Sequence, residues 1–304
     1  MKLKTKNLLT LSELSKKEFL HLIDFSIKLK KEAKNGKSKP LLKNKTLTMI
    51  FQKPSTRTRV SFEIGMFQLG GHAINLSSND MQLSRGESIE DTSKTLSRYT
   101  DCIMARVYDH SLVEKLSEFA TVPVINGLSD SFHPCQILAD LMTVKEKKKK
   151  LKGLKLAWIG DGNNVCNSMI YGCALSEIKM SVATPKGFEP NKKVVTEARL
   201  STEIEITNDP KKAIKNADVV VTDTFTSIHN VDPKRTKKFL PKYQVNSDLM
   251  MLAKKDAIFM HCLPAKRGNE VTSSVIDGTQ SVVWDEAENR LHTQKALLVS
   301  LIRA

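Results

Sequence analysis

The segment FQKPSTRTRVSFE, residues 51–63, gathers basic and hydroxyl side chains in a pattern that suits anion binding. Its cations are Lys53, Arg57 and Arg59, and its hydroxyls are Ser55, Thr56 and Thr58. The preceding run is strand-like, Pro54 ends it, and a helical pattern follows. The first turn of a helix presents free N–H groups and a positive dipole end. Hydroxyl and guanidinium donors at such a turn predict a cradle for an anion, with phosphate as the favoured ligand.

The alternative interpretation of this segment is an ordinary Ser or Thr helix cap with unrelated arginines nearby. A solvated basic face would not need the hydroxyls, and a hydrophobic core would not need the charges. The segment has no G-x-x-x-x-G-K-[ST] pattern, so it is not a nucleotide phosphate loop. It follows a predicted strand, and open α/β sheets bind ligands at the carboxyl ends of their strands.

Two more predicted strand ends carry polar side chains that can take part in chemistry. SFHPCQ contains His133, Cys135 and Gln136, and FMHCLP contains His261 and Cys262. Metal binding is disfavoured, because adjacent residues on a strand point to opposite faces and no pair has the spacing of a zinc site. Cys262 as a covalent nucleophile is a further alternative. No partner base is identifiable for it, so a positioning role is favoured.

The segment WIGDGNN, residues 158–164, is similar to a dinucleotide-binding turn, because it follows a strand and opens a helix. However, Val165 stands where the third glycine would be, and the next strand ends in ATPKG without an acidic residue for a ribose. NAD is therefore not expected. Asn163 and Asn164 at this strand end can instead hold a small polar ligand.

The elements that must position these residues follow from the hydrophobic pattern. Residues 12–31 predict an amphipathic helix with a Ser15–Glu18 capping box. A strand at 46–52, a helix from about Thr56 and a strand at 72–76 form a βαβ unit, which implies a parallel sheet. The helix carries Val60, Ile64 and Phe67 on one stripe. Further strands are expected at 101–107 and 122–128.

The same pattern restarts after a helix around residues 134–150. Strands are predicted at 155–160, 180–185, 218–223, 257–264 and 281–286, with helices at 163–177 and 288–304. The fold class is therefore α/β: two doubly wound parallel-sheet domains joined by interdomain helices. No internal repeat or low-complexity linker separates the halves.

The composition narrows the classes of partner. The chain has 304 residues, 40% of them hydrophobic, and a formal net charge of +15. Nucleic-acid binding is one interpretation of the lysine runs. Solvated helix faces and loops are favoured, because the runs are scattered and contain almost no aromatic residues for base stacking. No long apolar run predicts a membrane segment or signal peptide. The five cysteines form no CxxC pair, which fits a reducing, cytoplasmic setting.

The motifs FQKPSTRTRVSFE, HPCQ, HCLP and DEAENRLHTQKA together resemble the ornithine carbamoyltransferases, over essentially the whole chain. The STRTR block alone is shared with aspartate carbamoyltransferases, and HPCQ with HCLP favours ornithine. The resemblance implies a carbamoyl-phosphate-binding domain at 1–147 and an ornithine-binding domain at 148–285. It also implies that a C-terminal helix at about 286–304 packs back on the first domain.

Carried over onto this sequence, the resemblance implies a full set of site residues. Carbamoyl phosphate would be bound by Ser55, Thr56, Arg57, Thr58, Gln82, Arg106, His133, Gln136, Cys262, Leu263 and Arg290. Gln82 would come from a neighbouring subunit, which makes a homotrimer, or a higher multiple of trimers, the active assembly. Ornithine would be bound by Asn164, Asp223, Ser227 and Ile228, with Cys262 and Leu263 beside its side-chain amine.

The implied chemistry matches the residue types. An amine attacks the carbamoyl carbon, a tetrahedral oxyanion develops, and phosphate leaves. Thr58, Arg106 and His133 would supply donors to the oxyanion, and Arg57 would stabilise the leaving phosphate. Together with Cys262 they form the expected catalytic set. The reaction requires no metal or organic cofactor.

One segment departs from the family pattern D-x-W-x-S-M-G, because this chain reads DTFTSIHN at 223–230. Phe225, Ile228 and His229 replace the tryptophan, methionine and glycine. Glycine adopts positive φ at little cost and histidine does not, so loop closure and amine choice are open. Putrescine is the rival substrate. A non-catalytic carbamoyl-phosphate-binding or nucleic-acid-binding α/β protein is the alternative from another class.

Overall fold

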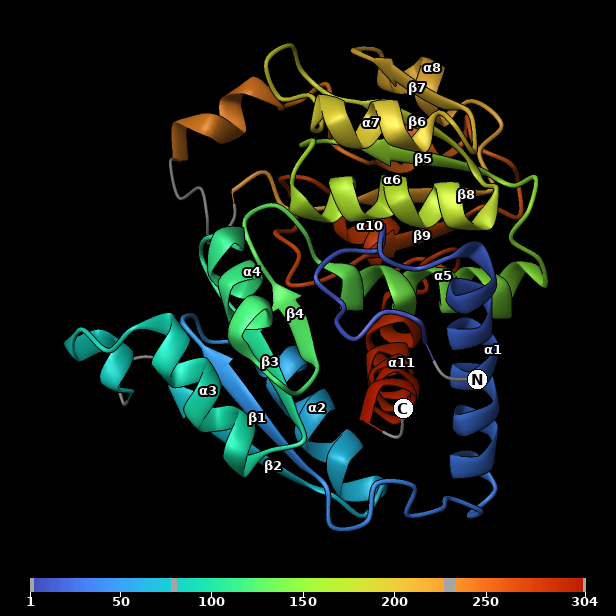
Figure 1. Cartoon of the computed structure of the whole chain (residues 1–304). Helices are drawn as coiled ribbons and strands as arrows, with labels where there is room; N and C mark the ends of the chain where they lie inside the picture. The colour runs from blue at the N-terminus through green and yellow to red at the C-terminus, as the bar shows by residue number, and fades with distance from the viewer. Residues whose placement is uncertain (1–2, 78–80, 227–232, 303–304) are drawn as a thin grey trace. The chain divides into compact units, whose positions relative to one another are not determined.

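The computed structural model describes residues 3–77, 81–226 and 233–302. The chain forms two compact units (Figure 1). Unit 1 comprises Met1–Met142 with Glu288–Ala304, and unit 2 comprises Thr143–Ala287. Two helices, α5 (Pro134–Lys148) and α11 (Val283–Ile302), continue from one unit into the other. The predicted α/β fold with two parallel sheets joined by helices is confirmed.

Unit 1 is built on a four-stranded parallel sheet with the order β2-β1-β3-β4. The strands are β1 (Thr46–Phe51), β2 (His72–Ser77), β3 (Cys102–Arg106) and β4 (Val124–Leu128). The chain runs outward from β1 to β2 and then returns to β3. The order therefore reverses between β1 and β3, and ligands of doubly wound sheets bind at such a switch point.

Helices cover both faces of this sheet (Figure 1). They are α1 (Lys16–Lys34), α2 (Thr56–Gln68), α3 (Ile89–Tyr99), α4 (His110–Phe119) and the 3-10 turn η2 (Gln82–Arg85), with the start of α5 and the end of α11. Val113 and Leu116 of α4 pack with β-strand residues such as Ile103. A methyl group placed on Gly65 of α2 would meet α11 at 3.4 Å, so these two helices pack closely.

Unit 2 has a five-stranded parallel sheet with the order β7-β6-β5-β8-β9. Its strands are β5 (Lys155–Ile159), β6 (Lys179–Ala183), β7 (Ile204–Thr207), β8 (Val219–Thr222) and β9 (Ile258–His261). Its helices are α6 (Asn164–Ser176), α7 (Lys192–Ala198), α8 (Pro210–Ile214), η3 (Pro233–Lys238), α9 (Ser247–Met250) and α10 (Ser273–Ile276). The switch point of this sheet lies between β5 and β8.

Of the local predictions, one capping box is confirmed, one strand is wrong, and one strand was not predicted. The capping box of α1 is present, with Ser15 and Glu18 bonding each other's backbone. The strand predicted at 281–286 is wrong: Val283 opens α11, and Ser281 makes only an isolated bridge to Phe259. Its β-branched run resembles a strand, but Asp285 and Glu286 in the first turn favour a helix start. The short strand β7 was missed.

The apolar stripe predicted on α2 is present, but it is exposed. Val60, Ile64 and Phe67 share one face of the helix, as predicted, but they are 50%, 42% and 77% exposed. The buried face consists of Thr58, Phe62, Gly65 and Met66. Phe62 and Met66 therefore anchor α2 to unit 1, and the predicted stripe lies on the surface of this single chain.

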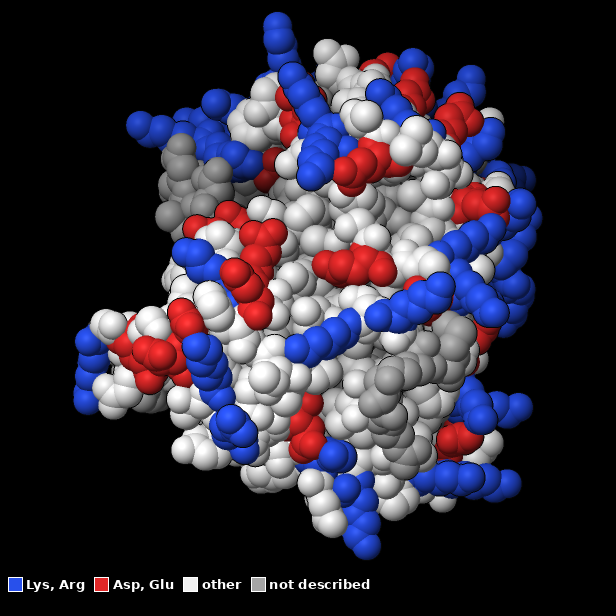
Figure 2. Space-filling view, in the orientation of Figure 1, with Lys and Arg blue, Asp and Glu red and all other residues white. Residues whose placement is uncertain are grey.

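The excess of Lys and Arg over Asp and Glu is distributed over the surface. Figure 2 shows Lys and Arg side chains scattered across the visible face with Asp and Glu among them. Many of the lysines are paired with carboxylates, as in Lys45–Asp101 and Lys254–Asp218, both at 2.7 Å. This arrangement is typical of solvated charged faces. Within the described residues, no helix is long and apolar enough to cross a membrane.

Candidate active site

The first turn of α2 lies at the switch point of the unit 1 sheet. Ser55 is the N-cap, and its hydroxyl accepts a hydrogen bond from the Thr58 N–H at 3.4 Å. The helix starts here because the extended backbone of Ser55 follows Pro54, and Ser caps an N-terminus well. The first turn of a helix has free N–H groups, and the neighbouring strand β3 ends in Arg106, which donates to the Thr58 hydroxyl of this turn.

Thr58 is the centre of the site in unit 1. Its hydroxyl oxygen accepts from Arg106 Nη1 at 3.4 Å and from Arg290 Nη2 at 3.3 Å. A hydroxyl has two acceptor positions and one donor hydrogen. Two guanidinium groups use the acceptor positions, so the Thr58 hydrogen is directed to donate to a ligand. We call Ser55, Thr58, Arg106, His133, Gln136 and Arg290 the anion cluster.

Arg290 reaches this cluster from α11 and is held on two sides. Its Nη1 donates to Gln136 Oε1 at 2.7 Å, and Gln136 Nε2 in turn donates to Asp140 Oδ1 at 2.8 Å. Arg290 is buried, with only 2% of its surface exposed. A buried guanidinium in this fixed geometry is preorganised for an oxyanion.

Gln294, one turn after Arg290, was missed by the sequence analysis. With its amide oriented to satisfy both neighbours, its oxygen accepts from Arg290 Nη2 at 2.9 Å. Its nitrogen then donates to Ser61 Oγ at 2.6 Å, and Ser61 bonds the Arg57 carbonyl. Gln294 therefore links Arg290 to the first turn of α2. No sequence motif pairs these positions.

His133 lies in the same cluster as a neutral imidazole. Burial holds its pKa well below the usual value, and the cations Arg290, Arg106 and Arg57 lower the pKa further. All three guanidinium groups therefore act electrostatically on this one ring. Neutral His133 can donate one hydrogen bond to a ligand oxygen without adding a proton-transfer step.

The three cations of the opening segment have different environments. Arg57 is half-buried beside the cluster, whereas Arg59 is exposed and paired with Glu63 at 3.0 Å. Lys53 is buried with its Nζ 3.6 Å from the centre of the Tyr108 ring. Burial and the nearby Arg106 lower the pKa of Lys53. Only Arg57 and the buried Lys53 are therefore close enough to influence a ligand at the cluster.

Gln82 and Thr56 are exposed. Gln82 begins η2, in the segment between β2 and α3 that projects from the side of unit 1 (Figure 1). Within the described residues, no hydrogen bond joins Gln82 to the anion cluster of its own chain. An exposed glutamine on a projecting turn is accessible to a second molecule.

The second group of polar residues lies at the switch point of the unit 2 sheet. Asn163 caps α6 and donates from Nδ2 to Asp223 Oδ2 at 2.7 Å. Cys262 Sγ lies 3.2 Å from Asp223 Oδ1, which also accepts from the Thr224 N–H. We call Asn163, Asp223 and Cys262 the carboxylate cluster. Asn164, the predicted ligand beside Asn163, is buried at the first position of α6.

His261 supports the turn that carries Cys262 and Leu263. Its Nδ1 accepts from the Leu263 N–H at 2.9 Å, which makes Nε2 the protonated nitrogen, 3.2 Å from Glu270 Oε1. Leu263 has φ of 57°, a conformation that costs energy for a side chain of this kind. The buried His261–Glu270 pair offsets that cost. Neither the role of Glu270 nor that of His261 was predicted.

Asp223, His261 and Cys262 each offer a potential metal ligand, and these atoms lie within 4.8 Å of one another. The sequence analysis expected no metal. In the structure both ring nitrogens of His261 are already engaged, with Leu263 and Glu270. A cation would have to compete with these hydrogen bonds, so we assign the three residues to positioning.

The departing segment at 223–230 is described only in part. Ser227, Ile228 and His229 lie outside the described residues. Phe225 is 1% exposed and stacks on Phe239 with ring centres 4.5 Å apart. The replacement of tryptophan by phenylalanine therefore concerns the core of unit 2.

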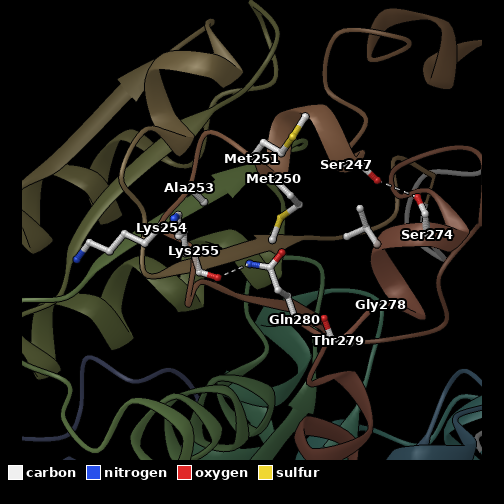
Figure 3. A pocket seen from close by; sticks show the side chains of 11 residues that line it. Ser247, Met250, Met251, Ala253, Lys254, Lys255, Ser274, Gly278, Thr279 and Gln280 are labelled. Atoms are coloured by element: carbon white, nitrogen blue, oxygen red, sulfur yellow. Dashed lines mark hydrogen bonds between the residues drawn. The ribbon is translucent and has the colours of Figure 1, made fainter.

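A pocket of about 530 Å³ lies elsewhere in unit 2 (Figure 3). Its lining comes from α9, α10 and the segments that follow them, and includes Met250, Lys254, Lys255 and Val275. Asn163, Asp223 and Cys262 belong to other turns. The pocket is lined mostly by exposed side chains, so it lacks the buried polar donors of the two clusters.

Comparison with known proteins identifies the family of the chain. Residues 6–146 match the aspartate/ornithine carbamoyltransferase carbamoyl-P binding domain, and residues 152–301 match the Asp/Orn binding domain of the same family. The chain belongs to the aspartate/ornithine carbamoyltransferase family. Apart from Arg290, the anion cluster lies within the first carbamoyltransferase domain, and the carboxylate cluster lies within the second.

Individual carbamoyltransferases cover the chain almost completely. The ornithine carbamoyltransferase of Cenarchaeum symbiosum is 62% identical over 99% of both chains. That of Methanosarcina acetivorans is 52% identical over 98% of this chain and 99% of its own. The solved Pyrococcus furiosus ornithine carbamoyltransferase superposes with a TM-score of 0.94 at 51% identity, over 98% of this chain and 97% of that one.

Proposed function

We propose that this chain transfers the carbamoyl group of carbamoyl phosphate to the side-chain amine of L-ornithine, giving L-citrulline and phosphate. The observation that carries the proposal is the Thr58 hydroxyl, which accepts from two guanidinium groups beside a helix N-terminus. The similar carbamoyltransferases support the choice of reaction. In this proposal residues 1–147 bind carbamoyl phosphate, residues 148–285 bind ornithine, and the helix at about 286–304 completes the first domain.

The anion cluster and the first turn of α2 beside it have distinct tasks in this reaction. The α2 turn, with Ser55, Thr56 and Arg57, binds the phosphate group, which becomes more negative as it leaves. Thr58, Arg106 and His133 donate to the carbamoyl oxygen as it acquires oxyanion character. Gln136 and Arg290 hold the same group from α5 and α11. Because His133 is neutral, stabilisation comes from the arginine charges and from hydrogen bonds.

The carboxylate cluster receives the amino acid. Asp223 attracts the α-ammonium group of ornithine, and Asn164 and Ser227 bind its α-carboxylate. Cys262 and Leu263 lie beside the side-chain amine, and Ile228 contributes an apolar contact. The amine must lose its proton before it attacks, because only its neutral form has a lone pair. The reaction needs no metal or organic cofactor.

A colorimetric citrulline assay tests the function directly. Purified protein is supplied with carbamoyl phosphate and either L-ornithine, putrescine or L-aspartate. We expect turnover with ornithine alone. Turnover with only putrescine or only aspartate would mean that this amine, and not ornithine, is the substrate. No turnover with any amine would indicate a non-catalytic protein that binds carbamoyl phosphate. Weak dependence on ionic strength would separate catalysis from nucleic-acid binding, whose affinity falls steeply with salt.

We further propose a homotrimer, or a multiple of trimers, in which Gln82 completes the anion cluster of a neighbouring subunit. The exposed position of Gln82 and the uncovered apolar stripe on α2 support this assembly. The variants Gln82→Ala and Arg106→Ala would damage different halves of a shared site. After denaturation and joint reassociation, mixed trimers should regain citrulline formation. An activity equal to the average of the two variants would contradict a shared site.

The cellular role is also proposed. Ornithine carbamoylation places the enzyme in arginine biosynthesis or in the reverse, catabolic direction. All five cysteines carry free thiols, which fits the reducing cytoplasm. We propose no nucleic-acid partner and no membrane association.

A further inference from the structure

Arg235, on η3, connects three parts of unit 2 near the carboxylate cluster. Its Nη2 forms an ion pair with Asp161 Oδ2, and its Nε donates to the Phe225 carbonyl at 2.9 Å. The guanidinium carbon also lies 4.5 Å from the centre of the Phe188 ring. The side chains of Arg235 and Asp161 are only 16% and 13% exposed. Arg235 is therefore fixed by charge, hydrogen bonding and stacking together.

The contacts of Arg235 involve the same two turns as the Asn163–Asp223 hydrogen bond. Asp161 precedes Asn163 by two residues in the turn after β5, and Phe225 follows Asp223 by two residues after β8. Arg235 joins Asp161 to Phe225, while Asn163 joins Asp223 at 2.7 Å. The same two chain segments are thus cross-linked twice. One cross-link contains Asp223, the carboxylate to which the proposed function assigns the substrate's α-ammonium group, and the other contains Arg235.

A purely stabilising role does not account for this arrangement. Burial raises the pKa of Asp161 to about 6, although Arg235 beside it acts to lower it. Burial and the nearby Asp223 therefore disfavour the charged form of Asp161 by more than Arg235 favours it. Buried ion pairs add little net stability compared with apolar side chains of similar volume, but they impose a defined geometry. The planar guanidinium, which bonds two acceptors at fixed angles, supplies such geometry.

We propose that Arg235 is a positioning residue that orients the Asp223 carboxylate for the α-ammonium group of the amino-acid substrate. It acts by holding the Phe225 backbone against the Asp161 turn, so that Asn163 and Asp223 meet in one register. This inference rests on the proposed ornithine transfer. It predicts an effect on amino-acid binding and none on the anion cluster of unit 1.

The test compares Arg235→Met and Arg235→Lys with the wild-type chain. Arg235→Met removes both polar contacts but keeps an apolar stem over Phe188. It should raise the KM for ornithine about tenfold or more, equivalent to about 1.4 kcal/mol, and change the KM for carbamoyl phosphate less than twofold. Arg235→Lys keeps a charge for Asp161 without the Nε donor, so its ornithine KM should be intermediate. Arg267→Met is the matched control, because Arg267 forms an exposed pair with Asp277 in the same unit.

A second measurement separates positioning from a general loss of structure. The compound 2-aminopentanoate carries the α-groups of ornithine but cannot react. Its binding is measured in the presence of carbamoyl phosphate. Its dissociation constant should rise in Arg235→Met by the same factor as the ornithine KM. If that variant does not fold, Arg235→Lys and Asp161→Asn are measured in the same way.

The outcomes distinguish this inference from the proposed function. A wild-type chain that forms no citrulline contradicts the function itself. An active wild type with an unchanged ornithine KM in the Arg235 variants contradicts the positioning role alone. Equal changes in both KM values would also overturn the inference, as would a lower melting temperature with unchanged 2-aminopentanoate binding. Either result would leave Arg235 a structural residue.

Discussion

The two units place polar side chains at equivalent points of their sheets but give them opposite charge. In unit 1, Arg57, Arg106 and Arg290 all lower the pKa of His133 near the β1–β3 switch point. In unit 2, a carboxylate, Asp223, lies at the β5–β8 switch point and is held by neutral donors. The same α/β frame thus suits one unit to an anion and the other to an ammonium group. The residues that follow the strands determine the chemistry of each site. The strands determine only where those residues meet.

The largest expected effect concerns the leaving phosphate in unit 1. Arg57→Ala should lower kcat by roughly two to four powers of ten, because it removes a charge that is needed most in the transition state. Arg59→Ala is the matched control on the same helix, since Arg59 is exposed and paired with Glu63. Steady-state citrulline kinetics measure both. Equal losses in the two variants would remove the distinction between an arginine beside the anion cluster and a surface arginine.

A smaller effect is expected when the unit 2 carboxylate is neutralised. Asp223→Asn should raise the ornithine KM by roughly one to two powers of ten, because it removes the counter-charge of the α-ammonium group. Phosphate binding, measured by calorimetry, should not change. Asp277→Asn, at an exposed pair with Arg267, serves as the control. Weaker phosphate binding in Asp223→Asn would mean that the two units do not bind their ligands independently.

Gln294 offers a test within the anion cluster. Gln294→Leu should raise the KM for carbamoyl phosphate about tenfold, because Arg290 loses an acceptor while Gln136 and Thr58 still hold it. Gln68→Leu changes another amide between α2 and α11, one that accepts from Lys295 at 2.9 Å. Steady-state kinetics at saturating ornithine measure both variants. An equal rise in the two would attribute the effect to helix packing rather than to Arg290.

The smallest expected effect is a difference between the two units in how their ligand binding depends on pH. The Asp161 carboxyl has a pKa raised to about 6 by burial, so it loses its charge below that pH. The attraction to Arg235 then weakens, and 2-aminopentanoate should bind a few-fold less tightly at pH 5 than at pH 7. Phosphate binding to the arginines of unit 1 should follow mainly the ionisation of phosphate itself, because burial and the arginines hold the pKa of His133 well below its usual value. Calorimetry over this pH range measures both ligands.

Folding stability should respond to Asp161 in the opposite direction. A carboxyl with a raised folded pKa stabilises the fold when protonated, and this contribution is lost as the pH rises through about 6. The unfolding free energy of the wild type should therefore fall between pH 4 and 6 relative to that of Asp161→Asn. Parallel curves for the two proteins in denaturant titrations would contradict the raised pKa.

The sequence predicted those parts of the site that are local in the chain. The strand, the Ser55 cap and the helix lie within one short segment, so their types and spacing were sufficient to place Thr58 and Arg57. Gln294 and Arg235 were missed, because their partners are set by packing between elements far apart in sequence. Arg290 was placed only through the family resemblance, since 232 residues separate it from Thr58.

One wrong prediction and one incomplete prediction show the limits of local sequence patterns. The run at 281–286 has β-branched residues typical of a strand, but acidic residues at a helix start outweighed that local preference. On α2, periodicity located an apolar face correctly but did not reveal whether the protein itself covers it. Periodicity reports which residues share a face, and only the packed structure reports what lies against that face.

The position of Arg290 also matters for synthesis of the chain on the ribosome. The α2 turn and Arg106 emerge first, and the cation that bonds both Thr58 and Gln136 follows only after all of unit 2 has been made. A polypeptide that ends before residue 290 carries the strands of both sheets and lacks this part of its anion cluster. The anion cluster of unit 1 is therefore complete only after unit 2 has been synthesised, which limits what an unfinished chain can bind.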